Sequence, residues 1–564
     1  MIVISSFRNL KNSFMTGSFG GRIILSDQKE NAMGWYENAV IYQIYPRSFK
    51  DSNGDGIGDL KGIIESLPYI KSLGVDAVWL SPIYKSPMKD FGYDVQDYRA
   101  IDPIFGTMKD FDQLVSKAHE LGLKVMMDMV LNHSSDLHKW FQQSKLKDSK
   151  YSDFYIWRDK VPNNWKACFG GSAWTYDSTR GQYYLHSFLK EQPDLNWHDD
   201  QCRQAIFNEV RYYLDKGVDG FRLDVINAVG KDPELRSNPF MLGETPRPYD
   251  MQNHIYDRNT EYTHEYIRQL RKVIEEYDDR ALLGEIMIQG KGQMEQSASY
   301  TGKNNDELQL CFEFSMTKQR INARNLRAVA GRWYQLCSKA EGKTPCWVLS
   351  NHDVPRAITR AGNKEETARM LAVYLLIQRG ASVIYFGEEI GMQSKSFPRK
   401  ELKDPLGIRY WPLFKGRDAE RRPMQWDFSE NMGFSTAKPW LEPNYTKDWK
   451  HLTVQGQESD EDSMLFLYRN LISLRKQREE ISQTDAVFCD AVPSGVLSYR
   501  FEKDGRCTAV VLNMSRRQLK IDLDVIAPGI KGMKVALGTH RRVDDYVKDG
   551  VLILPPGSGV VLTN

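Results

Sequence analysis

Eight short apolar runs recur along the chain, and each is separated from the next by enough residues for a helix. Parallel strands need such crossover connections, so this alternation predicts βα units rather than hairpins. Eight units in succession predict an α/β fold, a closed (β/α)8 or TIM barrel, in which the chemically active side chains lie at the carboxyl ends of the strands. The predicted strands are 39–46, 75–82, 124–133, 220–226, 281–286, 308–314, 344–353 and 381–389.

The chain of 564 residues has room for more than a barrel. Residues 134–200 are rich in Trp, Tyr, Asn, Gly and Ser and predict an inserted subdomain after the third strand. From residue 484 short alternating strands predict a C-terminal antiparallel β domain, a β-sandwich over 484–564. The barrel would then comprise 34–133 and 201–483, after a polar, unpatterned and flexible leader at 1–33.

The composition argues against several classes of partner. The 76 basic and 74 acidic residues nearly cancel, which gives no indication of nucleic acid or a charged membrane surface. No apolar run approaches the roughly 20 residues of a membrane span, and the amino terminus lacks the pattern of a secretory signal. The seven cysteines are scattered without metal-ligand spacing. These features predict a cytoplasmic protein with reduced thiols and leave its oligomeric state open.

Three acids each follow a different predicted strand: Asp224, Glu285 and Asp353. Because strand ends converge in a barrel, these side chains should face one another. Two close carboxylates are what a retaining glycosidase needs, one as the nucleophile and one as the acid/base. In GFRLDVIN (220–227), Arg222 would keep Asp224 ionised, although a purely structural ion pair at a strand end is the alternative. The apolar run LLGEI would favour the protonated form of Glu285.

Four motifs then resemble, in order, those of the α-amylase superfamily, glycoside hydrolase family 13: DMVLNH (128–133), GFRLDVIN (220–227), LLGEI (282–286) and SNHD (350–353). QPDLNW (192–197) and the run from Trp35 to Ile63 resemble its oligo-1,6-glucosidase/α-glucosidase branch, and the resemblance extends over 34–564. It implies that Asp224 is the nucleophile and Glu285 the acid/base. It also implies that Asp353 holds sugar hydroxyls and favours the distorted ring.

A second glutamate competes for the acid/base role. LGET (242–245) also places an acid, Glu244, directly after a glycine. It lies only about twenty residues past Asp224, which is too close for a crossover helix and the next strand. The prediction therefore stays with Glu285.

The resemblance also implies a set of side chains around the terminal glucose. Tyr93 would stack on the ring and Asp94 would accept its hydroxyls, with two histidines bonding the same sugar. Two phenylalanines would form apolar walls, and a glutamine and an arginine would add polar contacts. Outside this family context, plain packing or a turn is the alternative for each. The predicted substrate-binding residues are Asp94, Tyr93, His133, Phe169, Phe188, Gln192, Arg222, His352 and Arg421.

The run DSNGDGIGD (51–59) alternates oxygen-bearing side chains with glycines, a pattern typical of loops that wrap a hard cation. It lacks the final glutamate of an EF-hand but resembles the metal loop of the glucosidase branch. A structural Ca²⁺ or Mg²⁺ is predicted, and a glycine-rich turn without an ion is the alternative. The predicted ligands are Asp51, Asn53, Asp55, Asp59 and the carbonyl of Ile57.

The function predicted is a retaining, exo-acting α-glucosidase that hydrolyses short oligosaccharides and needs no organic cofactor. By resemblance, Val225 after the nucleophile favours α-1,6 bonds such as that of isomaltose, whereas the runs DPELRSN and DPLGIRYWP are typical of the broader α-glucosidase branch. An α-1,4- or sucrose-active glucosidase, or a glucosyl-transferring enzyme, would use the same acids. A transporter-associated binding protein or a structural carbohydrate-binding protein would not require the intact acidic set.

Overall fold

The computed structural model describes residues 34–243, 245–287, 292–540 and 546–564. Two elements of the sequence analysis, the predicted leader at 1–33 and Glu244, lie outside the described residues.

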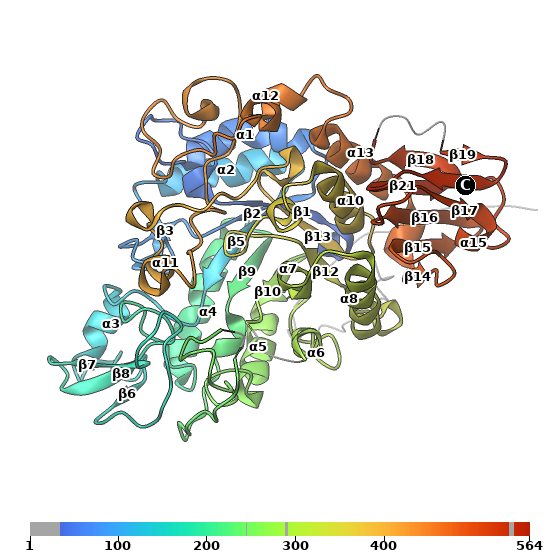
Figure 1. The fold of residues 1–564 in the computed structure, drawn as a ribbon. Coiled ribbons are helices and arrows are strands. Elements are labelled where there is room, and N and C mark those ends of the chain that lie inside the picture. Colours follow the sequence, from blue (N-terminus) through green and yellow to red (C-terminus); the bar gives the residue numbers. More distant parts are fainter. Residues whose placement is uncertain (1–33, 244, 288–291, 541–545) are drawn as a thin grey trace, which may run out of the picture. The chain divides into compact units, whose positions relative to one another are not determined.

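The eight predicted strands form a closed barrel in the order β1-β13-β12-β11-β10-β9-β5-β2 (Figure 1). Every neighbouring pair in the barrel is parallel. The predicted fold class is therefore confirmed. The strands are β1 (Val40–Ile44), β2 (Ala77–Leu80), β5 (Lys124–Val130), β9 (Gly220–Asp224), β10 (Ala281–Gly284), β11 (Leu310–Glu313), β12 (Cys346–Val348) and β13 (Ala381–Tyr385).

Buried side chains fill the barrel from both faces of its strands. Alternate residues such as Ile41, Trp79 and Phe312 pack inside the barrel, and the intervening ones pack outward against the helices. The helices that accompany the barrel are α1 (Leu60–Ser72), α2 (Met108–Glu120), α4 (Asp200–Asp215), α5 (Glu261–Ile274), α6 (Gln293–Ser299), α7 (Ser315–Lys318), α8 (Ala323–Leu336), α9 (Ala357–Arg360), α10 (Glu365–Leu376), α11 (Pro405–Tyr410), α12 (Val454–Gln457), α13 (Met464–Gln477) and α14 (Glu479–Gln483).

Local sequence explains where several helices begin and end. Thr107 and Asp110 form a reciprocal capping box at the start of α2. Asp59 caps α1 by accepting a hydrogen bond from the Gly62 amide at 2.8 Å. Gly122, at φ 68°, follows the end of α2 in the left-handed conformation that glycine adopts without strain.

A small irregular subdomain lies between β5 and α4, where the sequence predicts an insertion. It contains α3 (Lys139–Ser144) and an antiparallel sheet of β6 (Trp157–Arg158), β8 (Gln182–Leu185) and β7 (Trp174–Asp177), in that order. Aromatic packing supports it, for example Phe141 stacked on Trp157 with ring centroids 5.4 Å apart. Lys231 ties it to the segment after β9 through an ion pair of 2.9 Å with Asp194. A second small sheet, β3 (Tyr84–Lys85) with β4 (Asp97–Ile101), follows β2.

The C-terminal segment forms two antiparallel sheets, of five and three strands. The chain just after α10 contacts this domain, since the Tyr499 hydroxyl donates to the Ile377 carbonyl at 3.0 Å. Its elements are β14 (Val487–Phe488), β15 (Val496–Lys503), β16 (Arg506–Asn513), β17 (Leu519–Asp522), α15 (Leu523–Ile526), β18 (Lys534–Gly538), β19 (Val547–Lys548), β20 (Val551–Leu554) and β21 (Ser558–Thr563).

Candidate active site

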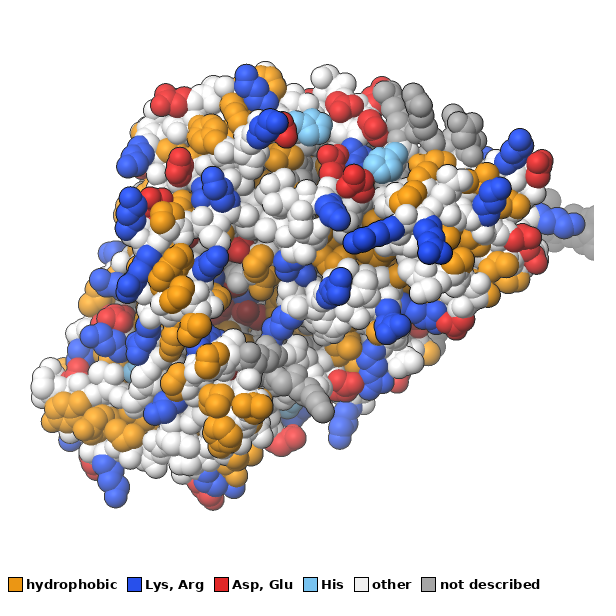
Figure 2. Space-filling model, in the orientation of Figure 1, with side chains coloured by type: hydrophobic (Ala, Val, Ile, Leu, Met, Phe, Trp, Pro, Cys, Tyr) orange, Lys and Arg blue, Asp and Glu red, His pale blue; other side chains and the backbone are white. Residues whose placement is uncertain are grey.

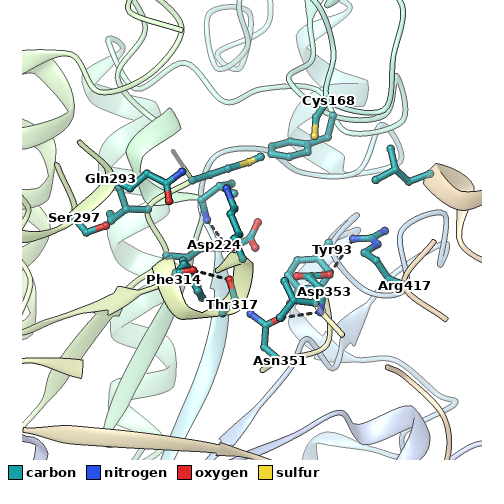
Figure 3. A pocket seen from close by; sticks show the side chains of 18 of the residues that line it. Tyr93, Cys168, Asp224, Gln293, Ser297, Phe314, Thr317, Asn351, Asp353 and Arg417 are labelled. Carbon is teal, nitrogen blue, oxygen red and sulfur yellow. Dashed lines mark hydrogen bonds and ion pairs between the residues drawn. The ribbon is translucent and has the colours of Figure 1, made fainter. Parts of the chain in front are cut away.

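A pocket of about 330 Å³ opens at the carboxyl ends of the barrel strands. Asp224 at the end of β9, Glu285 after β10 and Asp353 after β12 all line it. Figure 3 shows Asp224 and Asp353 reaching the pocket from different strands. The three acids that the sequence singles out therefore lie around one cavity, as convergent strand ends require.

Arg222 holds two of these acids and a third carboxylate behind the pocket. Its Nη1 donates to Asp128 Oδ1 at 2.7 Å and to Asp224 Oδ1 at 2.9 Å, while its Nη2 donates to Glu285 Oε2. The arginine is only 1% exposed and does not line the pocket. The alternative for GFRLDVIN was a single structural ion pair. The cluster in the structure is larger, because three carboxylates surround the one guanidinium of Arg222.

The three carboxylates around Arg222 carry more negative charge than one guanidinium neutralises. Burial is the largest cause that raises the pKa of the Asp224 carboxyl well above its ordinary value, and Glu285 adds to it, while Arg222 opposes both. Arg222 thus lowers the pKa of Asp224, as the sequence predicts, but burial and Glu285 together raise that pKa by more. A retaining glycosidase needs one of its two acids ionised and the other protonated, and here both accept hydrogen bonds from Arg222.

Val225, the residue after Asp224, has φ 36° and ψ 42°, a left-handed conformation that is an outlier for a β-branched residue. This backbone turn points the Val225 amide at Glu285 Oε2, at 3.3 Å. The side chain of Val225 also lines the pocket. Such strain is found where a site fixes the direction of a neighbouring group.

A second arginine, Arg417, also holds three carboxylates. Its guanidinium donates to Asp353 at 3.2 Å, Asp90 at 3.0 Å and Asp404 at 2.8 Å. It lines the pocket and lies over the Phe169 ring, 5.5 Å from the centroid. Figure 3 shows Arg417 directed toward Asp353. Arg417 and Asp90, joined by this ion pair, both line the pocket.

Asp353 is held as an anion. Burial would raise the pKa of its carboxyl, but His352 and the two arginines Arg417 and Arg421 hold the pKa well below the ordinary value. Arg421 Nη2 donates to Asp353 Oδ1 at 2.8 Å, and His352 Nε2 lies 3.1 Å from Oδ2. A fixed carboxylate of this kind accepts hydrogen bonds from sugar hydroxyls.

Tyr93 and His352 form a stacked pair at the pocket floor, with ring centroids 5.7 Å apart and planes 8° from parallel. Gln43 Nε2 lies 2.9 Å from His352 Nδ1 and donates to it, so Nε2 is the protonated nitrogen that faces Tyr93 and Asp353. Tyr93 lines the pocket, whereas His352 is fully buried behind it. His352 therefore orients Tyr93 and Asp353.

His133, Phe169 and Phe188 line the pocket as the resemblance implies, and the His133 and Phe188 rings lie 5.0 Å apart. Burial lowers the pKa of His133 to about 4, so it is neutral near pH 7. Gln192 does not line the pocket. It is fully buried and donates to Asp90 Oδ2 at 3.3 Å, with His133 Nε2 3.1 Å away, so it supports pocket residues.

Two of the residues predicted to bind sugar, Asp94 and Arg421, are not among those that line the pocket. Asp94 is fully buried, and its oxygens accept hydrogen bonds from the Ser86 hydroxyl at 2.9 Å and the Lys89 amide at 2.8 Å. Its carboxylate is thus directed into its own loop and away from the pocket, which Asp90 lines. Likewise Arg421 is 1% exposed and lies behind Asp353, while Arg417 lines the pocket.

Several pocket residues were missed from sequence. Asp90 lies four residues before Asp94 in the same turn, and Arg417 lies in the same arginine-rich run as Arg421. The sequence therefore places a like charge close to each predicted residue, which could have indicated Asp90 and Arg417. Asp128 begins the DMVLNH motif but was given no role. The pocket is also lined by Ile286 of the LLGEI motif and by Met287, Gln293, Met294, Ser297, Phe314, Thr317, Leu406 and Phe414.

The predicted metal loop is held by its own hydrogen bonds. Asp51 Oδ1 accepts from the Gly54 amide at 2.7 Å, and Asp51 Oδ2 from the Ser435 hydroxyl at 2.6 Å. Asp55 accepts from the Ile57 amide at 2.8 Å, and Asp59 caps α1. Across the described ranges no group of three or more His, Cys, Asp or Glu side chains is placed to hold a metal ion. The acids of the loop are thus held by hydrogen bonds within the protein, and the ion stays a prediction.

Two further observations bear on the sequence analysis. The seven cysteines are free and buried, as reduced thiols would be. Within the part of the chain that the structure describes, no helix has the length and apolar character to cross a membrane.

Comparison with known proteins identifies the family. Residues 43–484 match the alpha-amylase family, "Alpha amylase, catalytic domain". The chain therefore belongs to the α-amylase family of glycoside hydrolases, and both the predicted family and the predicted class of enzyme are confirmed.

Individual relatives cover most of the chain. A protein named "Probable alpha-glucosidase" from Rhizobium meliloti (strain 1021) is 42% identical over 475 residues, which is 81% of this chain and 85% of the relative. An "Oligo-1,6-glucosidase" from Parageobacillus thermoglucosidasius is 41% identical over 494 residues, covering 79% and 84%. The crystal structure of an alpha-glucosyl transfer enzyme, XgtA, is similar at a TM-score of 0.86 and 38% identity, covering 94% of this chain and 100% of that one.

Proposed function

We propose that the protein is a retaining, exo-acting α-glucosidase that releases glucose from the non-reducing end of short α-glucosides. One observation carries the proposal: Asp224 and Glu285, at the ends of adjacent strands, accept hydrogen bonds from the same guanidinium in a pocket whose far end is closed. Two carboxylates bound to one guanidinium are close together, which suits nucleophile and acid/base on one glycosidic bond. The names of the glucosidase relatives support the same activity.

In the first step Asp224 reacts in its ionised form, which Arg222 favours, and the carboxylate oxygen that Arg222 does not hold attacks the anomeric carbon. The bond from that carbon to the leaving oxygen breaks, and Glu285 gives its proton to that oxygen. The hydrogen bonds from Arg222 and Val225 both fall on Glu285 Oε2, so Oε1 is the oxygen that would carry the proton. In the second step Glu285 takes a proton from water, which attacks the same carbon and releases Asp224.

Asp90 and Arg417 would limit cleavage to the chain end. Their ion pair of 3.0 Å would obstruct a second sugar beyond the terminal glucose on that side. Asp90 and Asp353 would accept its hydroxyls, Tyr93 would stack on the ring, and Phe169 and Phe188 would form apolar walls. These roles rest on the positions of the residues around the pocket.

We further propose a preference for α-1,6 bonds, with Val225 as the residue that sets it. Its branched side chain lines the pocket directly beside the nucleophile, where it restricts how the leaving sugar enters. A glucosyl-transferring enzyme is the second candidate, supported by the similarity to XgtA. It would use the same acids and differ in whether a sugar or water intercepts the glucosyl intermediate.

The test is a sugar-release assay on isomaltose, maltose, sucrose and soluble starch, with Asp224→Ala as the control. Glucose from isomaltose with little from starch would support an exo-acting α-1,6 enzyme, and longer products would support transfer. Asp224→Ala should lose at least ~10⁴-fold in rate while remaining folded. If the wild-type protein released no more sugar from any glucoside than the variant does, the proposal would be wrong.

Two finer predictions accompany the proposal. If the loop 51–59 binds Ca²⁺, removal of the ion by dialysis against EDTA should lower the Tm of the wild type. Asp55→Asn should abolish this response. An unchanged Tm in the wild type would support the ion-free turn. A cytoplasmic location is supported by the seven unpaired thiols, and cell fractionation would test it.

A further inference from the structure

A groove of about 900 Å³ lies between the barrel helices and the C-terminal domain, separate from the catalytic pocket. One wall is formed by the first turns of α8 and α10, and the other by the segments around Ser494, Ser515 and Gly557. Four basic residues and one acid, Glu366, line it. Figure 2 shows Lys and Arg side chains gathered on this face over α8, α10 and the adjoining edge of the C-terminal domain. The basic residues are Arg320, Arg324, Lys364 and Arg516.

We name this groove the basic groove. Its four cations lack acidic partners that would compensate their charge. All four are exposed, and within the described ranges none of their side chains forms an ion pair or a hydrogen bond. On the same helix α8, Arg332 pairs with Glu295 at 2.7 Å and Arg327 pairs with Asp490. Like charges concentrated without counter-charges produce a positive potential that attracts anions.

The helix starts add to this potential. α8 has 14 residues and α10 has 12, and their first turns, including Ala323 and Thr367, line the groove. The residue that precedes α10, Lys364, makes no side-chain cap, so the first amides of this helix lack the acceptor that a capping residue supplies. A helix N-terminus favours negative charge, and arginine matches the oxygens of a phosphate group.

We propose that the basic groove is a binding site for a phosphate-bearing small molecule. Guanidinium groups from Arg324 on the barrel and Arg516 on the C-terminal domain would contact the phosphate from opposite walls. A groove bounded by two domains suits a small anion, which distinguishes it from the long basic stripe that a nucleic acid needs. The groove is separate from the catalytic pocket, since no residue that lines the pocket also lines the groove.

Isothermal titration of the full chain with inorganic phosphate, and separately with glucose 6-phosphate, tests this site at constant ionic strength. The variant Arg324→Gln/Arg516→Gln should bind at least about tenfold more weakly, because two charge-assisted contacts are lost. The matched control is Arg332→Gln, on the same helix outside the groove. It should bind like the wild type, as should the inactive Asp224→Ala variant.

Each outcome decides the proposal. Binding of both anions would assign the site to free phosphate, and binding of glucose 6-phosphate alone would assign it to a phosphate ester. No binding at about 10 mM of either anion, or equal affinity in the wild type and the double variant, would overturn it. Thermal unfolding checks that the double variant folds, and Arg320→Gln/Lys364→Gln provides a second pair.

The basic groove also adjoins the catalytic pocket along the chain. Ser315 and Thr317 of α7 line the pocket, and the residues of the groove begin at Arg320. An anion that fixes Arg320 and Arg324 would restrain this segment, so saturating phosphate should change the KM for isomaltose in the wild type and leave it constant in Arg324→Gln/Arg516→Gln. A KM that does not respond in the wild type would contradict this coupling while leaving the binding result to stand alone.

Discussion

Arg222 and Arg417 each hold three carboxylates, but at different depths of the same pocket. Arg222 is buried behind the site, with Asp128, Asp224 and Glu285 around it. Arg417 forms part of the pocket wall, with Asp90, Asp353 and Asp404 around it. In the proposed mechanism the first cluster would adjust the charge on the reacting acids, and the second would position the sugar. The same chemical grouping would then serve catalysis in one place and binding in the other.

The first prediction concerns Arg222, where we expect the largest effect. Arg222→Lys keeps a charge but loses the planar fork that reaches three carboxylates at once. Removing part of a buried charge network costs about 3–5 kcal/mol, and kcat should fall about 10³-fold. Urea unfolding and steady-state kinetics would measure the two losses. A variant with wild-type kcat would show that the cluster is only structural.

The second prediction concerns Arg417, which is expected to affect binding more than chemistry. In Arg417→Lys the ion pair with Asp90 weakens, the closed end of the pocket loosens, and kcat/KM should fall about 10²-fold, mainly through KM. Steady-state kinetics on isomaltose would separate the two constants. Lys415→Gln, two residues away and outside the pocket, is the control. An effect on kcat alone would break the distinction between the two arginine clusters.

The third prediction uses the pKa of Asp90, which burial raises from 3.8 to about 6 despite Arg417 and Arg421. Because the folded-state pKa is the higher one, the stability from Asp90 is fully present below pH 4 and is lost as the pH rises through 6. The total is about 3 kcal/mol at most. Asp90→Asn does not titrate, so its stability relative to the wild type should increase from pH 4 to pH 7. Thermal unfolding of both proteins from pH 4 to pH 7 would measure the difference in stability. A difference that does not change with pH would contradict the prediction.

The smallest effect is expected at Val225. Val225→Ala removes two methyl groups beside the nucleophile and should shift the ratio of kcat/KM for isomaltose over maltose about tenfold toward maltose. Competition between the two sugars, with products separated by chromatography, would measure the ratio. An unchanged ratio would show that Val225 does not set the linkage preference and that residues elsewhere in the pocket do.

The two clusters differ in how far the sequence predicts them. The Arg222 cluster belongs to strands, where the apolar pattern fixes the register and the strand ends fix the direction of Asp224. The Arg417 cluster comes from the turn at Asp90 and from the long segment after β13, and no periodicity indicates which of several charges points inward. The sequence predicts Asp94 and Arg421 as sugar-binding residues, and the pocket is lined by Asp90 and Arg417, four residues away in each case.

The same contrast applies to the fold. All eight barrel strands were predicted because each is a short apolar run with room for a crossover helix. The leaving-group end of the pocket, with Met287, Met294 and Phe314, depends on how α6 and α7 pack, which only the structure gives. The charge balance of the whole chain likewise concealed the basic groove, where cations gather locally.

The most direct test of the account is to trap the covalent intermediate. A 5-fluoro-α-glucosyl fluoride would glucosylate the nucleophile while slowing its release, and mass spectrometry of the digested protein would locate the label. The account predicts one label per chain, on the peptide that contains Asp224, and none in Asp224→Ala. A label on Glu285 or Asp353, or turnover without any adduct in the wild type, would contradict it.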